Sequence, residues 1–367
     1  MNETDPKSPP PSQIGAPLPI AQASARNRVI LAPMSGVTDL PFRQMASRFG
    51  AGLVVSEMVA SQELVVDNPD SRLRMDVSGL ETSVVQLAGR EAQWMGEAAK
   101  IAEGAGASII DINMGCPAKK VTSGYSGSAL MRDLDHALTL VEATVGAVSV
   151  PATLKMRLGW DETTINAPEL ARRACDAGVQ MITVHGRTRC QFYKGLADWP
   201  AIARVKQAVD VPLVANGDVV SSADAQRILQ ESGGDAMMVG RGAYGRPWLP
   251  GYLAASEPEA FLAKLPKAVD LIAEHYQALV SHHAVHKGLP LGVRIARKHF
   301  GWYLDTTDLQ RPLARAERDV LFGCDAPDQV MTTIRSVWED AVWLRPMGRE
   351  NGTNADLSGD MFKARAA

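Results

Sequence analysis

Short apolar runs recur along the first part of the chain, and each is followed by a Gly, Asn or Asp turn and then by a segment of helical periodicity. The runs are rich in Val, Ile, Leu and Met and cover residues 28–33, 52–58, 82–89, 108–115, 152–159, 181–186, 212–217 and 235–240. The intervening segments, such as 90–106 and 166–178, place apolar residues at i, i+3 and i+4, which is typical of amphipathic helices. Runs that are apolar throughout predict strands buried on both faces, as in a parallel sheet.

The alternation of strands and helices predicts an α/β fold. Eight such units within roughly 220 residues favour a closed (β/α)8 TIM barrel over an open doubly wound sheet. An open sheet that binds a dinucleotide would have a Gly-rich loop directly after its first strand, but residues 33–36 are Pro-Met-Ser-Gly. The Gly-Ala-Gly sequence at 104–106 precedes a strand instead of following one.

The pattern changes from about residue 258, where helical segments follow one another without strand runs, as at 266–283, 292–304 and 327–344. The first 20 residues contain six prolines, and the last 21 are polar and punctuated by Gly. We therefore expect a flexible Pro-rich arm at 1–24, a TIM barrel that carries the catalytic site at 25–255, a smaller helical domain at 256–346 and a flexible tail at 347–367.

Charge and cysteine content narrow the class of protein. The net charge of −3 means that any polyanion must be bound by a local basic patch. The four cysteines form no C-x-x-C pair, which argues against a zinc site or a disulfide framework and favours a reducing compartment. The chain shows no signal peptide and no apolar run long enough to span a bilayer, so we expect a cytoplasmic protein that needs no membrane, no metal and no obligate protein partner.

In a TIM barrel the active site forms at the carboxyl ends of the strands and in the loops that follow. The residues that interrupt the apolar runs there are Met34, Ser35, Glu57, Gln86, Asn113, Cys116, Lys155, His185, Arg187, Asn216, Asp218, Gly240 and Arg241. The last two strand ends, residues 216–218 (Asn-Gly-Asp) and 240–242 (Gly-Arg-Gly), predict a phosphate cradle, because glycines allow the backbone to approach an anion closely. The alternative is a pair of Gly turns with a surface Arg.

A phosphate cradle on one side of the barrel mouth suits a phosphorylated planar cofactor. Lys155 would place a positive charge where a reduced flavin accumulates negative charge, and Gln86 offers both a donor and an acceptor to a pyrimidine-like edge. A salt bridge between Lys155 and a carboxylate at the barrel rim is the alternative.

Cys116 differs from the other three cysteines because it follows a strand end and is flanked by Asn113, Lys119 and Lys120. A thiol in this position is a nucleophile or an acid, whereas a lone cysteine is more often a small buried hydrophobe. No histidine lies near Cys116 in the sequence as an evident general base for its thiol. Because thiols are mostly protonated at neutral pH, the acid role is the hypothesis that we carry forward.

The motifs at these strand ends resemble those of the tRNA-dihydrouridine synthases, and most closely the bacterial B-type branch. They are LAPMSGVTDLPFR (31–43), SEMV (56–59), VQLAG (85–89), DINMGCPAKKV (111–121), KMRLGW (155–160), VHGRTRCQFYKG (184–195), ANGDV (215–219) and VGRGAYGRPW (239–248). The resemblance runs in order from about residue 26 to 340, and the motifs around Cys116 and at 185–195 are its most specific parts. Ser35 is a departure, because Ala is common at this place in the family.

This resemblance implies FMN-dependent, NADPH-driven reduction of the C5=C6 bond of uridines in tRNA. It implies that Cys116 is the proton donor to C5, and that Asn113, Lys119 and Arg187 face the substrate. The residues implied to bind FMN are Pro33, Met34 and Ser35 along the ring, Gln86 and Lys155 at its polar edge, His185 beside it, and Asn216, Gly217, Asp218, Gly240 and Arg241 at the phosphate end.

The predicted helical domain contains a basic segment without acidic residues at 287–299. Arg294, Arg297 and Lys298 share one helix face by their spacing, which together with the resemblance predicts a contact to tRNA. A solvated basic face is the alternative. The opposite face is expected to be buried through Val293, Ala296, Phe300 and Leu304, and the histidines at 275, 282, 283 and 286 are expected to be exposed and not to bind metal.

Three other functions compete with this interpretation. The chain could be an FMN barrel that acts on a free pyrimidine, which the basic helical segment argues against. It could be a flavin-free RNA-binding regulatory protein, which purified protein without yellow colour would favour. A non-redox enzyme acting on a sugar phosphate is expected to have a pair of acid/base carboxylates, and Glu57 is a solitary candidate.

Overall fold

The computed structural model describes residues 13–347. Eight parallel strands close into a barrel, because β4 pairs with both β3 and β6 while β11 pairs back to β3. In order around the barrel these strands are β3 (Val29–Leu31), β4 (Leu53–Val55), β6 (Ser83–Ala88), β7 (Ile109–Met114), β8 (Ala152–Arg157), β9 (Ile182–His185), β10 (Leu213–Asn216) and β11 (Ala236–Val239). Each lies within one of the eight predicted runs, so the TIM barrel is confirmed.

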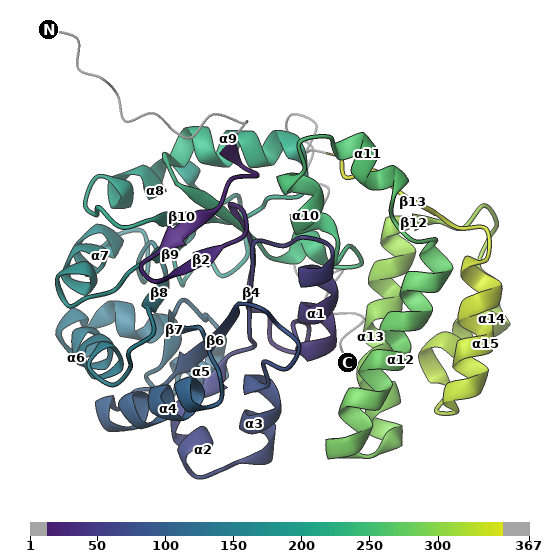
Figure 1. The fold of residues 1–367 in the computed structure, drawn as a ribbon, viewed down its shortest axis with the longest axis horizontal. Coiled ribbons are helices and arrows are strands. Elements are labelled where there is room, and N and C mark those ends of the chain that lie inside the picture. The colour runs from purple at the N-terminus through teal and green to yellow at the C-terminus, as the bar shows by residue number, and fades with distance from the viewer. Residues whose placement is uncertain (1–12, 348–367) are drawn as a thin grey trace, which may run out of the picture.

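Helices surround the barrel as a ring, which Figure 1 shows nearly end-on. They are α1 (Leu40–Arg48), α2 (Ser61–Val65), α3 (Pro69–Met75), α4 (Ala92–Gly104), α6 (Leu134–Val145), α7 (Ala167–Asp176), α8 (Trp199–Lys206), α9 (Ser222–Ser232) and α10 (Leu249–Ala254). Side chains of Asp39, Asp133, Asp198 and Ser221 cap four of them by accepting from the backbone N–H three residues later. Helix α7 buries Ala167, Leu170, Ala171 and Ala174 against the barrel, as its period predicts.

The second barrel strand is split in two. β4 pairs with the start of β6, and the short strand β5 (Val59–Ala60) pairs with its end. Between them, the Ser56 hydroxyl accepts a hydrogen bond from Gln86 N at 2.9 Å, and Glu57 Oε1 accepts from Gly36 N at 2.6 Å. The break therefore directs two polar residues to the neighbouring strand ends.

A hairpin of β1 (Leu18–Ile20) and β2 (Ala23–Ala25) precedes the barrel. Leu18 and Ile20 are buried in a cluster with inward-facing strand residues such as Ile30 and Ile109. The expected flexible arm at 1–24 is therefore wrong for residues 18–24, whereas residues 1–12 lie outside the described part of the chain.

Helices of the carboxyl-terminal part form a separate layer beside α1 (Figure 1). They are α11 (Pro258–Ala263), α12 (Ala268–Lys287), α13 (Leu289–Thr306), α14 (Arg315–Gly323) and α15 (Pro327–Trp338). Val293, Ala296 and Phe300 are buried as predicted, and Leu304 is half-buried. The expectation of helices without strands is wrong in one detail, because β12 (Thr307–Asp308) pairs with β13 (Val342–Trp343). Between residues 13 and 347, no helix has the length and hydropathy to cross a membrane.

Candidate active site

Strand register brings the predicted polar residues together at the carboxyl end of the barrel. Asn113 on β7 pairs with Lys155 on β8, and His185 on β9 pairs with Arg157 on β8 and Asn216 on β10. Residues that are far apart in the sequence therefore line one mouth.

A chain of hydrogen bonds connects the barrel interior to Cys116. The carboxylate of Asp111 accepts from the Thr153 hydroxyl and from Gln86 Nε2, both at 2.7 Å. Gln86 Oε1 in turn accepts from Asn113 Nδ2 at 2.7 Å, and Asn113 Oδ1 accepts from Cys116 N at 3.0 Å. The order of donors and acceptors fixes the orientation of both amides, so the loop that carries Cys116 is anchored to the barrel core.

Lys155 lies half-buried at the mouth and donates to Asn216 Oδ1 at 3.1 Å. Burial and the nearby Arg157 charge lower its pKa to about 8, while Asp111 and Cys116 act in the opposite direction. Within residues 13–347 no carboxylate forms an ion pair with this ammonium group, which favours an anionic ligand over the rim salt bridge that the sequence left open.

His185 is buried beside four cations. Burial, followed by the charges of Arg157, Lys155, Arg187 and Arg241, lowers its pKa well below the ordinary value, so its imidazole is neutral at neutral pH. Its Nε2 lies 3.1 Å from Arg187 Nη1.

The loop after β9 is locked by Arg187, whose side chain is 1% exposed. Its guanidinium donates to the carbonyls of Lys194 and Gly195 and forms an ion pair with Asp218 at 2.6 Å. Asp218 also accepts from Ala197 N. Both residues therefore shape the loop. The roles that the resemblance implied, Arg187 facing the substrate and Asp218 at the phosphate end, stay predictions.

The loop after β7 holds Cys116 partly exposed. The Cys116 carbonyl accepts from Ser128 N and Oγ, and Arg157 Nε donates to Gly115 O at 2.8 Å. Gly127 has a φ of +60°, and a Cβ there would lie 3.2 Å from Cys116 Cβ, so only glycine lets the loop close against the thiol. Lys119 is exposed at the start of α5 (Lys119–Thr122).

The remaining predicted cofactor residues lie on the loops after β3, β10 and β11. Pro33 and Met34 are half-buried and Ser35 is exposed. A Cβ on Gly240 would lie 3.9 Å from the Met34 sulfur, so these two turns are neighbours. Arg241 begins the short helix η3 (Arg241–Ala243) and lies over the Tyr193 ring at 4.9 Å. Together with Lys155 and the side-chain amides of Gln86 and Asn216, Arg241 and these glycine turns form the predicted cofactor site. A lysine, an arginine, two amides and glycine turns fit a phosphorylated ring such as FMN.

Comparison with known proteins shows the family of this chain. A family model described as dihydrouridine synthase (Dus) matches residues 30–335. The chain belongs to the dihydrouridine synthase family. A probable tRNA-dihydrouridine synthase of Rhizobium leguminosarum is 61% identical over 77% of this chain and 86% of the relative, and one of Rhodobacter capsulatus is 55% identical over 85% and 95%. The tRNA-dihydrouridine synthase B of Xanthomonas axonopodis is 45% identical over 87% and 95%, which confirms the resemblance to the B-type branch.

Solved structures confirm the barrel at the level of the fold. A 2-naphthoyl-CoA reductase aligns with a TM-score of 0.55 at 12% identity, over 68% of this chain and 53% of that protein. The old yellow enzyme of Trypanosoma cruzi aligns with a TM-score of 0.51 at 13% identity, over 68% and 95%. The chain spans about half the length of the reductase.

The basic face predicted on α13 of this dihydrouridine synthase is not a single stripe. Arg297 is mostly buried and donates to the carbonyl of Cys324 and to Asp325 between α14 and α15. Lys298 is directed at the barrel, where a Cβ on Gly36 would lie 3.5 Å from its Nζ. Arg294 is 61% exposed. The predicted basic face is therefore divided: the α14–α15 connection holds Arg297, the barrel loop after β3 faces Lys298, and Arg294 is exposed. A contact of these residues with tRNA stays a prediction.

The histidines of α12 also differ from expectation. His275 and His283 are buried, and His283 Nε2 lies 2.9 Å from Asp39 Oδ2 at the start of α1. His275 Nδ1 lies 2.8 Å from the Tyr303 hydroxyl. His283 joins the helical layer to the start of α1 through this bond, and His275 packs edge-on against Phe42 of α1 at 5.6 Å, whereas His286 is exposed as predicted. Within residues 13–347, no group of three side chains is arranged to hold a metal ion.

Two site residues were missed by sequence reasoning. Asp111 holds Gln86, and Arg157 joins the Cys116 loop to the loop after β9 through the carbonyls of Thr188 and Phe192, each at 2.8 Å. Both residues lie within the motifs given above, each as a charged residue in an otherwise apolar strand. A charged side chain in such a strand was the signal by which the sequence could have revealed them.

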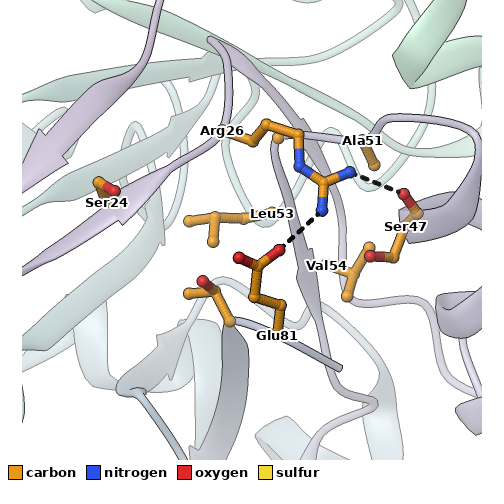
Figure 2. Close-up of a pocket in the computed structure, with 9 residues that line it drawn as sticks. Ser24, Arg26, Ser47, Ala51, Leu53, Val54 and Glu81 are labelled. Atoms are coloured by element: carbon orange, nitrogen blue, oxygen red, sulfur yellow. Dashed lines mark hydrogen bonds and ion pairs between the residues drawn. The ribbon is translucent and has the colours of Figure 1, made fainter. Parts of the chain in front are cut away.

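A surface pocket lies near the amino-terminal ends of β3, β4 and β6, opposite the candidate site (Figure 2). It is lined by residues around Leu53, and Arg26 there bridges Ser47 O and Glu81 Oε2, each at 3.2 Å. Arg26 and Glu81 are exposed, so this is a surface ion pair of small energetic value.

Proposed function

We propose that this protein reduces the C5=C6 bond of uridines in tRNA to 5,6-dihydrouridine, with FMN as cofactor and NADPH as reductant. The observation that carries the proposal is the position of Cys116: a partly exposed thiol at the barrel mouth, on a loop that Asn113 and Arg157 hold through Cys116 N and Gly115 O. The names of the curated relatives support the substrate.

The mouth would hold FMN through residues at the ends of five strands. Lys155 and Gln86 would contact the polar edge of the ring, Pro33, Met34 and Ser35 its face, and the phosphate end would lie at the turns of Asn216, Gly217, Gly240 and Arg241. Asp218 and His185 would lie behind the residues that contact FMN. Asp218 would hold Arg187 and Arg241 in place through its ion pairs with them. Bound FMN, once reduced, supplies a hydride for C6 of the uracil.

Cys116 would supply the proton. As C6 gains a hydride, C5 needs a proton, and the S–H bond of Cys116 breaks to give it. The sulfur would keep the electron pair of this bond, on a loop that Arg157 holds through Gly115 O at 2.8 Å. Partial exposure lets solvent return the proton afterwards.

A uracil that is paired or stacked in RNA cannot reach a barrel mouth, so the base must be extruded. Asn113, next to Cys116, would contact its edge, and Lys119 on the same loop would meet the backbone phosphates. Arg294 is the basic residue of α13 that remains exposed enough for a contact to tRNA.

The Cys116→Ala variant tests this proposal, with Cys190→Ala on the neighbouring exposed loop as the matched control. Cys116→Ala should keep FMN and still oxidise NADPH, but dihydrouridine formation in unmodified tRNA should fall by about 100-fold or more, as for a missing general acid. Mass spectrometry of digested tRNA measures the product. Unchanged dihydrouridine formation in Cys116→Ala refutes the donor role.

A further inference from the structure

Exposed aromatic side chains gather at the barrel mouth. Between residues 13 and 347, the Trp, Tyr and Phe residues with the most exposed surface are Tyr125 (61%), Tyr193 (38%) and Phe192 (44%). Tyr125 lies on the loop that carries Cys116, and the other two lie on the loop after β9. The remaining aromatic residues of this part of the chain are at least half-buried, so their surface is removed from water in the usual way.

Two of these aromatic residues also have an unfavourable backbone. Tyr125 has a φ of 58° and Phe192 a φ of 55°, in the left-handed region that bulky side chains rarely adopt. Glycine lies close by at 124 and 195, yet neither strained position uses it. A strained, solvent-exposed aromatic residue stabilises neither the backbone nor the core, and such outliers concentrate where a ligand is bound.

The loops hold these rings in place. The Phe192 carbonyl accepts from buried Arg157 at 2.8 Å, and the Phe192 ring packs edge-on against Tyr193 at 4.7 Å. The guanidinium carbons of Arg157 and Arg241 lie 5.5 and 4.9 Å from the Tyr193 ring centroid. The Phe192–Tyr193 pair is therefore backed by two cations and keeps its orientation before any ligand arrives.

The loop that carries Tyr125 contacts the loop that carries Phe192 and Tyr193. Tyr125 N donates to Thr122 O, and Thr122 Oγ1 accepts from Arg189 Nη2 at 3.5 Å across the two loops. Arg189 also stacks on Trp160 at 4.7 Å.

Charge on these loops identifies the partner. Residues 115–132 and 186–197 contain no Asp or Glu, although the chain as a whole has a net charge of −3. Their basic residues are Lys119, Lys120, Arg132, Arg189 and Lys194, besides Arg187, which is buried in its ion pair with Asp218. Exposed aromatic rings among cations and no acids are the combination with which proteins bind single-stranded nucleic acid, because bases stack on the rings while cations neutralise phosphates.

We propose that Tyr125 and the Phe192–Tyr193 pair form a stacking platform for the nucleotides that adjoin the extruded uridine. The inference rests on the proposed function, and it assigns the bases on either side of the target to these rings. Because every base has an aromatic face, the platform accepts different neighbouring sequences.

Binding of unmodified tRNA at several salt concentrations tests the platform. Phe192→Ala and Tyr125→Ala should each weaken binding by about tenfold, the loss expected for one base–aromatic stack. The slope of affinity against salt should not change, because stacking releases no counterions. Lys119→Ala should instead reduce that slope, and Phe192→Tyr should restore wild-type affinity.

Leu196→Ala is the matched control, since Leu196 is 63% exposed on the same loop but has no ring, and it should bind tRNA normally. Thermal unfolding and NADPH oxidation without tRNA show that each variant is folded. Unchanged affinity in both aromatic variants, or an equal loss in Leu196→Ala, overturns the platform. A wild-type protein that forms no dihydrouridine in the same tRNA refutes the proposed function instead.

Discussion

Lys155 has the pKa shift with the clearest consequence for ligand binding. Its ammonium group is charged at neutral pH and loses the proton as the pH rises through about 8. If it contacts the flavin edge, the affinity for FMN should fall above that pH, by up to about tenfold for each pH unit. Titration of the apoprotein with FMN, followed by flavin fluorescence, measures this. Lys155→Met should bind more weakly without this pH dependence, and a flat profile in the wild type contradicts the contact.

Asp111 determines the order of donors and acceptors beneath the site. Asp111→Asn replaces an acceptor by an NH2 group that faces Gln86 Nε2, so unfolding free energy should fall by about 1–3 kcal/mol. Adding Gln86→Glu restores an acceptor for both neighbouring amides and should recover most of the loss. Urea unfolding of the two variants measures this. A double variant less stable than Asp111→Asn would show that the network does not act as a unit.

The loop after β9 depends on one ion pair. Arg187→Met leaves the buried Asp218 carboxylate without its nearest cation, and unfolding free energy should fall by about 3 kcal/mol. Adding Asp218→Asn removes the charge that has lost its nearest cation and should recover part of the loss. Urea unfolding of both variants checks this expectation, and a double variant no more stable than Arg187→Met would contradict it.

Barrel elements were predictable from the sequence because strands buried on both faces are apolar throughout. The β1–β2 hairpin was missed because Pro17 precedes β1 and Pro19 lies within it, and only contact with the barrel interior buries its few apolar residues. The spacing of Arg294, Arg297 and Lys298 was correct as a helix period. It does not reveal that the α14–α15 connection supplies carbonyl acceptors to Arg297.

The candidate site was predictable to the extent that its residues end strands. Position alone placed Gln86, Asn113 and Lys155 at one mouth, and register brings them together. It could not show that Arg187 is turned inward, because its partner Asp218 follows a different strand and their pairing exists only when the barrel closes.

At the scale of the whole molecule, buried histidines couple the helical layer to the barrel and make stability depend on pH. Burial lowers the pKa of His275 from 6.5 to about 4. As the pH falls below 6.5, the unfolded chain takes up this proton first, so the folded state loses up to about 3 kcal/mol by pH 4. Urea unfolding across this pH range should show the loss.

His275→Gln should flatten that dependence by about one proton. His286→Gln, an exposed position on the same helix, is the control and should leave it unchanged. Equal slopes in His275→Gln and the wild type would contradict the assignment.

The β1–β2 hairpin fills the amino-terminal end of the barrel with Leu18 and Ile20. Under the proposed function, NADPH and tRNA would then both reach the reacting atoms through the opposite end of the barrel. Each would exclude the other while it is bound, so the two half-reactions would alternate. Double-reciprocal plots of initial rate for one reactant, at several fixed concentrations of the other, should therefore be parallel lines.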